Sequence, residues 1–199
     1  MNLIKTDLTE ITYLPNGGNL VYVPGFYSPE DAEELSNLGT DINWEDHGSP
    51  RLVAWVGDFE YSYSRITHKA APWTSTLQAI REKVEKSVFG YSNGQYQGVL
   101  LNLYRDENDS VAYHADNEPM ICQDTTIASV SFGAARSFRL KYIGPDRPKP
   151  KNTKITLENG SLLLMSGAIQ KFWLHSIPKS KVPVGPRINL TFRRYSENK

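Results

Sequence analysis

His114 and Asp116 stand two positions apart in the segment NLYRDENDSVAYHADNEP, residues 102–119. Side chains two apart on a strand point the same way, so this imidazole and this carboxylate can share one face. The strand-like segment KFWLHSI contains His175, the best-placed third ligand. Two imidazoles and one carboxylate on one side of a metal leave other coordination positions open, which favours a catalytic ferrous site.

The His-X-Asp pair alone is weak evidence, because ordinary composition often produces it by chance. The alternative is that His114 is a hydrogen-bonded structural histidine. His47 and His68 lie in polar, loop-like sequence without a partner at ligand spacing, so we expect both at the surface. Cys122 is the only cysteine, which excludes an intramolecular disulfide and a zinc cluster built on thiolates.

A polar stripe alternates with an apolar stripe in the segment RINLTFR, residues 187–193. The polar stripe consists of Arg187, Asn189, Thr191 and Arg193. On an outward-facing strand it would meet solvent. In a barrel it would line the lumen, where the planar fork of arginine suits a carboxylate. Six residues of strand span about 20 Å, so the two arginines could then enclose a small dicarboxylate.

Two helices are expected before residue 95. One begins in SPEDAEELSNLG, where Ser28 can cap it, Pro29 suits its first turn and Gly39 can end it. The other lies between Trp73 and Gly90, because apolar residues recur on one stripe with charges opposite: Leu77, Ile80, Val84 and Val88.

Short runs rich in Val, Ile, Leu, Phe and Tyr dominate the chain from Tyr96 onward. The seven runs predict a jelly roll or barrel, and they are QGVLLNLY, TTIASVSFG, RSFRLKYI, KITLE, SLLLM, KFWLHSI and RINLTFRRY. The Asn-Gly pair in ENGS, residues 158–161, predicts a tight hairpin that joins KITLE to SLLLM. The segment IGPDRPKPKNTK, residues 143–154, predicts an exposed basic loop.

The length of 199 residues with 39% hydrophobic residues suits one globular domain. The formal net charge of zero hides an asymmetry: residues 1–60 carry 2 basic and 11 acidic side chains, and the remainder carries 20 and 11. A polyanionic partner is therefore not excluded, although acidic and basic faces that neutralise each other are the alternative. With no apolar stretch near the roughly 20 residues of a membrane span, and no signal-peptide pattern, we expect an intracellular protein.

Taken in order, these motifs resemble those of the AlkB-type Fe(II)- and 2-oxoglutarate-dependent dioxygenases, which remove alkyl groups from nucleic-acid bases. The resemblance covers residues 102–193 through NLYRDENDSVAYHADNEP, IASVSFGAAR, LENGSLLLMSGAIQKFWLHSIPKS and PRINLTFR. Upstream, PRLVAWVGDFEYSYSRIT is similar to the vertebrate repair members. The ordered combination of His-X-Asp, a distal His and Arg-X-Asn-X-Thr-X-Arg makes the resemblance highly specific.

The resemblance implies a mainly β (α+β) fold, a double-stranded β-helix or jelly roll with flanking N-terminal helices. Residues 1–199 would form a single domain, with a helical and substrate-lid region over 1–95 and the catalytic core over 96–199. The implied Fe(II) ligands are His114, Asp116 and His175. O2 would be the oxidant, and the implied residues for the cosubstrate 2-oxoglutarate are Asn102, Tyr104, Arg187, Asn189 and Arg193.

The implied reaction is oxidative demethylation of N-alkylated bases, such as 1-methyladenine and 3-methylcytosine, in DNA or also in RNA, with release of formaldehyde and succinate. A base drawn out of a duplex needs aromatic neighbours, for which the candidates are Trp55, Tyr61 and Tyr63, each with a core position as the alternative. Glu118 matches an acid close to the damaged base. Asn117 departs from the acid that related repair enzymes often have there. Phosphates would meet Arg51 and Arg65, and also the basic loop with Arg147, Lys149 and Lys151.

Two other functions stay open from the sequence. The same oxygenase chemistry could act on a protein or small molecule, because fold does not determine substrate. A non-catalytic jelly roll that binds nucleic acid is the second alternative. The expected partner is alkylated DNA and not a membrane, for a monomer in the cytoplasm of a bacterium or the nucleus of a eukaryote.

Overall fold

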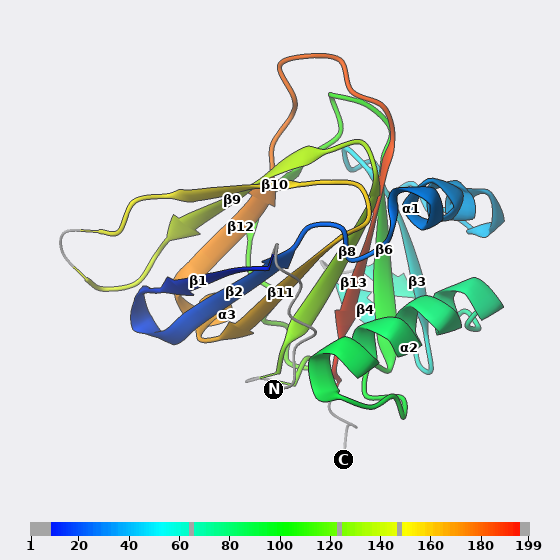
Figure 1. The fold of residues 1–199 in the computed structure, drawn as a ribbon, viewed down its shortest axis with the longest axis horizontal. Helices are drawn as coiled ribbons and strands as arrows, with labels where there is room; N and C mark the ends of the chain where they lie inside the picture. The colour runs from blue at the N-terminus through cyan, green and yellow to red at the C-terminus, as the bar shows by residue number, and fades with distance from the viewer. Residues whose placement is uncertain (1–8, 64–65, 123–124, 147–148, 196–199) are drawn as a thin grey trace.

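The computed structural model describes residues 9–63, 66–122, 125–146 and 149–195, which form two antiparallel sheets with helices outside them (Figure 1). The large sheet contains seven strands, in spatial order β1 (Glu10–Leu14), β2 (Gly18–Val23), β11 (Ser161–Gly167), β8 (Ile127–Gly133), β13 (Arg187–Arg193), β6 (Gly98–Tyr104) and β3 (Leu52–Gly57). The small sheet contains four strands, β10 (Thr153–Leu157), β9 (Arg136–Tyr142), β12 (Trp173–Ile177) and β7 (Val111–His114). A separate hairpin consists of β4 (Tyr61–Tyr63) and β5 (Ile66–His68). These sheets confirm the mainly β jelly roll.

Both expected helices are present. Helix α1 (Pro29–Ser36) begins as predicted, with Ser28 Oγ accepting a hydrogen bond from the Asp31 amide at 3.1 Å. It ends earlier than Gly39, because the chain tightens into a 3-10 turn, η2 (Asn37–Asp41). Helix α2 (Ser75–Phe89) ends at Gly90, whose φ of 82° is the left-handed conformation that glycine adopts most readily. Two shorter elements are η1 (Pro15–Gly17) and α3 (Ile169–Phe172).

Each of the seven strand-like runs forms a strand, but the turn at residues 158–161 is not a hairpin. Strands β10 and β11, which it joins, belong to different sheets. The Gly160 amide donates to the Ser131 carbonyl at 2.8 Å, and the Gly133 amide donates to Asn159 Oδ1 at 2.9 Å. The turn is thus attached to β8 of the large sheet, and it carries the chain from one sheet to the other. The predicted Asn-Gly turn is present, but the predicted pairing of β10 with β11 is wrong.

Apart from the largely exposed edge strand β1, the strands of the large sheet are buried on both faces, and most of them have a nearly continuous apolar sequence. Leu162 and Leu164 of β11 face the cluster that includes the α2 stripe, with α2 lying along the outer face of the sheet (Figure 1). Leu163 and Met165 face the other way and pack with residues of the small sheet. The space between the sheets is therefore closed by side chains, except where polar residues replace the apolar ones.

Three strands that precede residue 95, namely β1, β2 and β3, pair within the large sheet. The division of the chain at residue 95 stays a prediction. In the basic loop, Lys149 and Lys151 are exposed, and Arg147 lies outside the described residues. Among the helices that the structure describes, none has the length and apolar character needed to cross a bilayer.

Glu85 breaks the expected pattern of α2, because its carboxylate is fully buried although the other face of the helix carries the charges. Its Oε1 accepts a hydrogen bond from the Tyr96 amide at 2.8 Å. Its Oε2 accepts from Ser92 Oγ and from the amides of Asn93 and Gly94 at 2.8 to 3.2 Å. One side chain thus closes the loop that leads from α2 into β6.

Replacing Glu85 by Ala should lower the free energy of unfolding by about 3 kcal/mol, because three buried or half-buried amides lose a charged acceptor. Urea denaturation followed by circular dichroism measures this loss. Glu34→Ala, which removes an exposed carboxylate from α1, is the matched control and should change the free energy by less than about 0.5 kcal/mol. Equal and small effects of the two substitutions would contradict the role of Glu85.

Candidate active site

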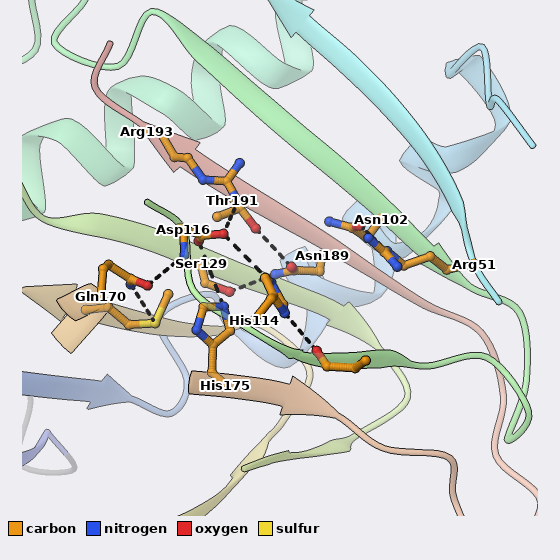
Figure 2. Close-up of polar contacts among 12 residues, drawn as sticks. Arg51, Asn102, His114, Asp116, Ser129, Gln170, His175, Asn189, Thr191 and Arg193 are labelled. Atoms are coloured by element: carbon orange, nitrogen blue, oxygen red, sulfur yellow. Dashed lines mark hydrogen bonds and ion pairs between the residues drawn. The ribbon is translucent and has the colours of Figure 1, made fainter. Parts of the chain in front are cut away.

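Two neighbouring strands of the small sheet bring the three predicted metal ligands together (Figure 2). His114, at the end of β7, pairs with His175 on β12, and their ring centroids are 4.2 Å apart. Asp116 reaches the same side from the loop after β7, with 3.8 Å between Oδ1 and His114 Nε2 and 3.9 Å between Oδ2 and His175 Nε2. These distances are too long for hydrogen bonds. The three donor atoms lie within 4.8 Å of one another and can hold one divalent metal.

The two imidazoles are arranged to offer lone pairs. His114 Nδ1 lies 2.9 Å from the carbonyl oxygen of Ala112, and a proton on Nδ1 leaves the Nε2 lone pair facing Asp116. Burial and the neighbouring His114 lower the pKa of His175 to about 3, so the His175 imidazole is neutral at neutral pH. Neutral imidazole is the form that binds a metal.

Asp116 is held as a carboxylate by its surroundings. Arg193 Nη2 donates to Asp116 Oδ1 at 2.9 Å, and both side chains are buried. Burial alone would raise the pKa of Asp116, but Arg193 and the two imidazoles outweigh it and lower the pKa to about 2. The Asp116 amide donates to Gln170 Oε1 at 2.8 Å, which fixes the backbone of the loop. The carboxylate is therefore ionised and positioned before any metal binds.

The polar stripe of β13 faces the space between the two sheets and not the solvent, as expected for a strand that lines a barrel. Arg187 is 1% exposed and Arg193 is 4% exposed. Arg187 Nη2 donates to Ser131 Oγ at 2.9 Å, whereas Nε and Nη1 of both arginines are buried without a hydrogen-bond partner in the described part of the chain. Burial lowers the pKa of Arg187 to about 10, which leaves it charged at neutral pH. A buried cation with unused donors is costly unless an anion meets it, so this wall suits an acidic ligand.

Strand β6 contributes further polar groups to the same pocket. Asn102 is buried, and its Oδ1 accepts a hydrogen bond from Arg51 Nε at 2.7 Å. The Tyr104 ring lies 5.2 Å from Cζ of Arg187. Arg51, which we expected at phosphates, is thus engaged by Asn102 (Figure 2). The five residues implied for the cosubstrate line one pocket with the triad, and they are Asn102, Tyr104, Arg187, Asn189 and Arg193.

Both described side chains of the expected aromatic lid are buried, and Tyr61 is 0% exposed. Trp55 is 2% exposed and stacks on Tyr61 at 4.6 Å between ring centroids, within a cluster that includes Phe59 and Tyr195. Trp55 is therefore a core residue, which was the alternative to a place in the lid, because the Tyr61 ring covers it. Tyr61 itself lines the pocket of the triad. The Tyr63 side chain and Arg65 lie outside the described residues.

Glu118 lies close enough to the triad to be influenced by it. Its Oε2 is buried and has no hydrogen-bond partner among the residues whose structure is described. Burial raises the pKa of Glu118, against the opposing influence of Arg193 and His114. The carboxyl group can therefore take up a proton more readily than an exposed glutamate, and it can donate a hydrogen bond when protonated.

Several residues that support the site were not predicted from the sequence. Ser129 and Ser131 on β8 bind the polar residues of β13, and their alternation in the segment SVS was a usable signal. Phe138 stacks on His175 with ring centroids 5.4 Å apart, which restricts the ring. Gln170, in the short helix α3, contacts Asp116 only through the tertiary fold, so its spacing gave no signal.

His68 is not a surface residue, contrary to our expectation. It is 2% exposed, because β5 turns it inward against the Tyr61 ring and toward Glu45. His47 remains partly exposed. Both histidines line a groove of about 700 Å³ that also reaches Arg51 and His114, and that groove therefore adjoins the metal-ligand cluster.

Comparisons with known proteins identify the family to which this chain belongs. Residues 33–193 match the family model of the 2OG-Fe(II) oxygenase superfamily. The human alpha-ketoglutarate-dependent dioxygenase alkB homolog 3 is 37% identical over 206 residues, covering 95% of this chain and 71% of that protein. The human DNA oxidative demethylase ALKBH2 is 35% identical over 154 residues, covering 74% of this chain and 58% of that protein.

A solved structure described as OsALKBH1 has the same fold, with a TM-score of 0.66 at 16% sequence identity over 94% of this chain and all of that one. The chain belongs to the AlkB family within the 2OG-Fe(II) oxygenase superfamily and is a dioxygenase that uses Fe(II), 2-oxoglutarate and O2.

Proposed function

We propose that this chain oxidatively removes alkyl groups from N-alkylated bases of DNA, with His114, Asp116 and His175 as the ligands of Fe(II). One observation carries the proposal: a single pocket combines these metal ligands with buried guanidinium donors of Arg187 that have no partner among the described residues. The DNA substrate is supported by the relative that is named a DNA oxidative demethylase. Bases such as 1-methyladenine and 3-methylcytosine are the proposed substrates.

The proposed cosubstrate ligands lie on two neighbouring strands, β6 and β13. Arg187 would receive one carboxylate of 2-oxoglutarate, because its free Nε and Nη1 can donate two charge-assisted hydrogen bonds. The other proposed contacts come from Asn102 and Tyr104 on β6 and from Asn189 and Arg193 on β13. Ser131 and Ser129 hold Arg187 and Asn189 in position.

When bound, Fe(II) would supply the oxidant for hydroxylation of the alkyl carbon: one oxygen atom of O2 would go to 2-oxoglutarate, which leaves as succinate and CO2, and the other to a methyl group, which leaves the base as formaldehyde. The residues of the chain prepare the site for this reaction. Arg193 keeps the Asp116 carboxylate ionised, and burial keeps the His175 imidazole neutral. The arginine wall orients the cosubstrate, and the closed core between the sheets excludes water.

A base in a duplex must leave the stack to reach this pocket. Tyr61 and Glu118 are proposed as its neighbours, since Tyr61 lines the pocket and the buried Oε2 of Glu118 has no hydrogen-bond partner among the described residues. Tyr63 and Arg65 remain predicted contacts of the nucleic acid. RNA as a second substrate and a monomeric enzyme belong to the same proposal, as does action in the cytoplasm of a bacterium or the nucleus of a eukaryote.

Incubation with a 1-methyladenine oligonucleotide, Fe(II), ascorbate and 2-oxoglutarate should remove the mass of one CH2 unit per methylated base. The oxidation needs the bound cosubstrate, so mass spectrometry should detect no loss when 2-oxoglutarate is omitted. A panel of single- and double-stranded DNA and RNA defines the substrate. If 2-oxoglutarate decays but no methylated nucleic acid reacts, the substrate is a protein or a small molecule and the DNA proposal is wrong.

Arg187→Lys should weaken binding of 2-oxoglutarate roughly 10- to 100-fold, because each lost charge-assisted hydrogen bond contributes about 1.5–3 kcal/mol. Isothermal titration calorimetry on the Mn(II)-loaded chain measures the affinity without turnover. Arg139→Lys is the matched control, since the Arg139 side chain on β9 is exposed, and it should bind 2-oxoglutarate as tightly as the wild type. Unchanged affinity of the Arg187 variant would remove this residue from the cosubstrate site.

Gln170→Leu should lower the affinity for Fe(II) roughly 10-fold, because supporting residues of a metal site typically contribute 10- to 100-fold. The substitution removes the acceptor of the Asp116 amide and leaves the three ligands in place. Competition with a chromophoric chelator measures the affinity. Gln170→Glu restores an acceptor and should recover most of it. A loss of iron in the Leu variant that the Glu variant does not reverse would argue against positioning by this bond.

A further inference from the structure

A second group of metal-type side chains lies outside the triad, where the loop before β3 meets the β4–β5 hairpin. Glu45 Oε2 is 2.7 Å from His47 Nε2 and 2.8 Å from His68 Nδ1. The backbone of Glu45 is fixed by two hydrogen bonds with Val53 on β3, at 2.8 and 3.0 Å. Three potential ligands thus converge from two separate segments, and their donor atoms lie within 4.8 Å of one another.

The three side chains differ in exposure in a way that suits an accessible site. The His68 side chain is 2% exposed, whereas His47 is 27% exposed and Glu45 is 35% exposed. The buried histidine gives a rigid ligand, because β5 and the stacked Tyr61 ring hold it. The two exposed residues leave a path to solvent through the groove that both histidines line.

The distances also indicate the coordination that this group offers. Zinc and similar ions bind nitrogen and oxygen at about 2.0–2.2 Å, so pairs of donors 2.7 and 2.8 Å apart would subtend roughly 80° at the ion. This angle is near the right angle of octahedral coordination, and the remaining positions would be taken by water from the groove. Two imidazoles and a carboxylate suit the borderline divalent ions, including Zn²⁺, Co²⁺ and Ni²⁺.

We propose that Glu45, His47 and His68 form a second site for a divalent transition-metal ion, made of residues distinct from the ferrous triad. To bind the ion, each imidazole takes its other tautomer: the proton of His47 moves from Nε2 to Nδ1 and that of His68 from Nδ1 to Nε2, so that the lone pairs beside Glu45 Oε2 face the ion. In this way the ion joins the loop at residues 45–47 to β5 more strongly than the two hydrogen bonds do.

The proposed ion site at His68 lies next to Tyr61, one of the aromatic side chains expected to contact the substrate. The His68 ring stacks on Tyr61, with centroids 6.2 Å apart and an interplanar angle of 19°. Tyr61 lines the pocket of the triad. An ion at His68 therefore restrains β5 and, through it, the aromatic wall of the catalytic pocket. The inference does not depend on the identity of the substrate.

The test measures the number of zinc ions bound per tag-free full chain. Metals are first removed with a chelator, and the chain is then brought to equilibrium with Zn²⁺ by dialysis. The wild type should retain two ions per chain, since zinc also occupies the triad. His114→Ala should retain one, His47→Ala should retain one, and the double variant should retain none. A His114→Ala chain without zinc, or a His47→Ala chain that keeps both ions, would overturn the proposal. Circular dichroism verifies the fold, which truncation of the partly exposed His47 should preserve.

Glu45→Gln distinguishes a metal site from a hydrogen-bonded anchor. The amide oxygen can still accept from both imidazoles, but the negative charge is lost. In the His114→Ala background, zinc should raise Tm, because an ion that binds only the folded chain stabilises it. Adding Glu45→Gln should weaken zinc binding by about tenfold or more and abolish the rise in Tm. A zinc-dependent rise that persists in the Gln variant would show that the ion binds elsewhere.

Discussion

The buried ion pair between Asp116 and Arg193 is the contact on which the site depends. It joins the loop after β7 of the small sheet to the last residue of β13 in the large sheet. Each charge offsets the desolvation of the other, and the removal of either would leave an uncompensated ion in the interior. Asp116 raises the pKa of Arg193 well above its usual value against the effect of burial, while Arg193 lowers the pKa of Asp116. One interaction thus closes the barrel and prepares a metal ligand.

Strand β13 shows how a single sequence can serve the fold and the chemistry. Its apolar residues pack outward into the cluster that contains the α2 stripe, and this packing supplies the stability. Its polar residues face the pocket, where each of two guanidiniums keeps donors without a hydrogen-bond partner among the described residues. Such unsatisfied groups reduce stability, so they are expected where a ligand completes them. The second cluster, at Glu45 and His68, differs from β13, because its side chains form hydrogen bonds with one another.

Local patterns predicted the secondary structure well, because each depends on neighbours in sequence. The cap at Ser28, the end of the second helix by Gly90 and the α2 stripe are short-range signals, and the structure contains all three. Apart from the end of α1, the errors concern contacts between distant segments. The Asn-Gly turn was recognised, but its attachment to Ser131 of β8 was not visible in the turn itself. Gln170 was missed for the same reason.

The sequence by itself determined which donors the chain has: two imidazoles and a carboxylate at compatible spacings, and a strand with polar and apolar residues in alternation. Only the tertiary structure decided that the polar stripe of β13 faces inward, that Trp55 lies behind Tyr61 and that His68 is buried beside Glu45. Alternation defines two faces of a strand but does not say which one meets water. That choice depends on the free energy of packing the whole sheet against its helices and its partner sheet, which involves residues far apart in the chain.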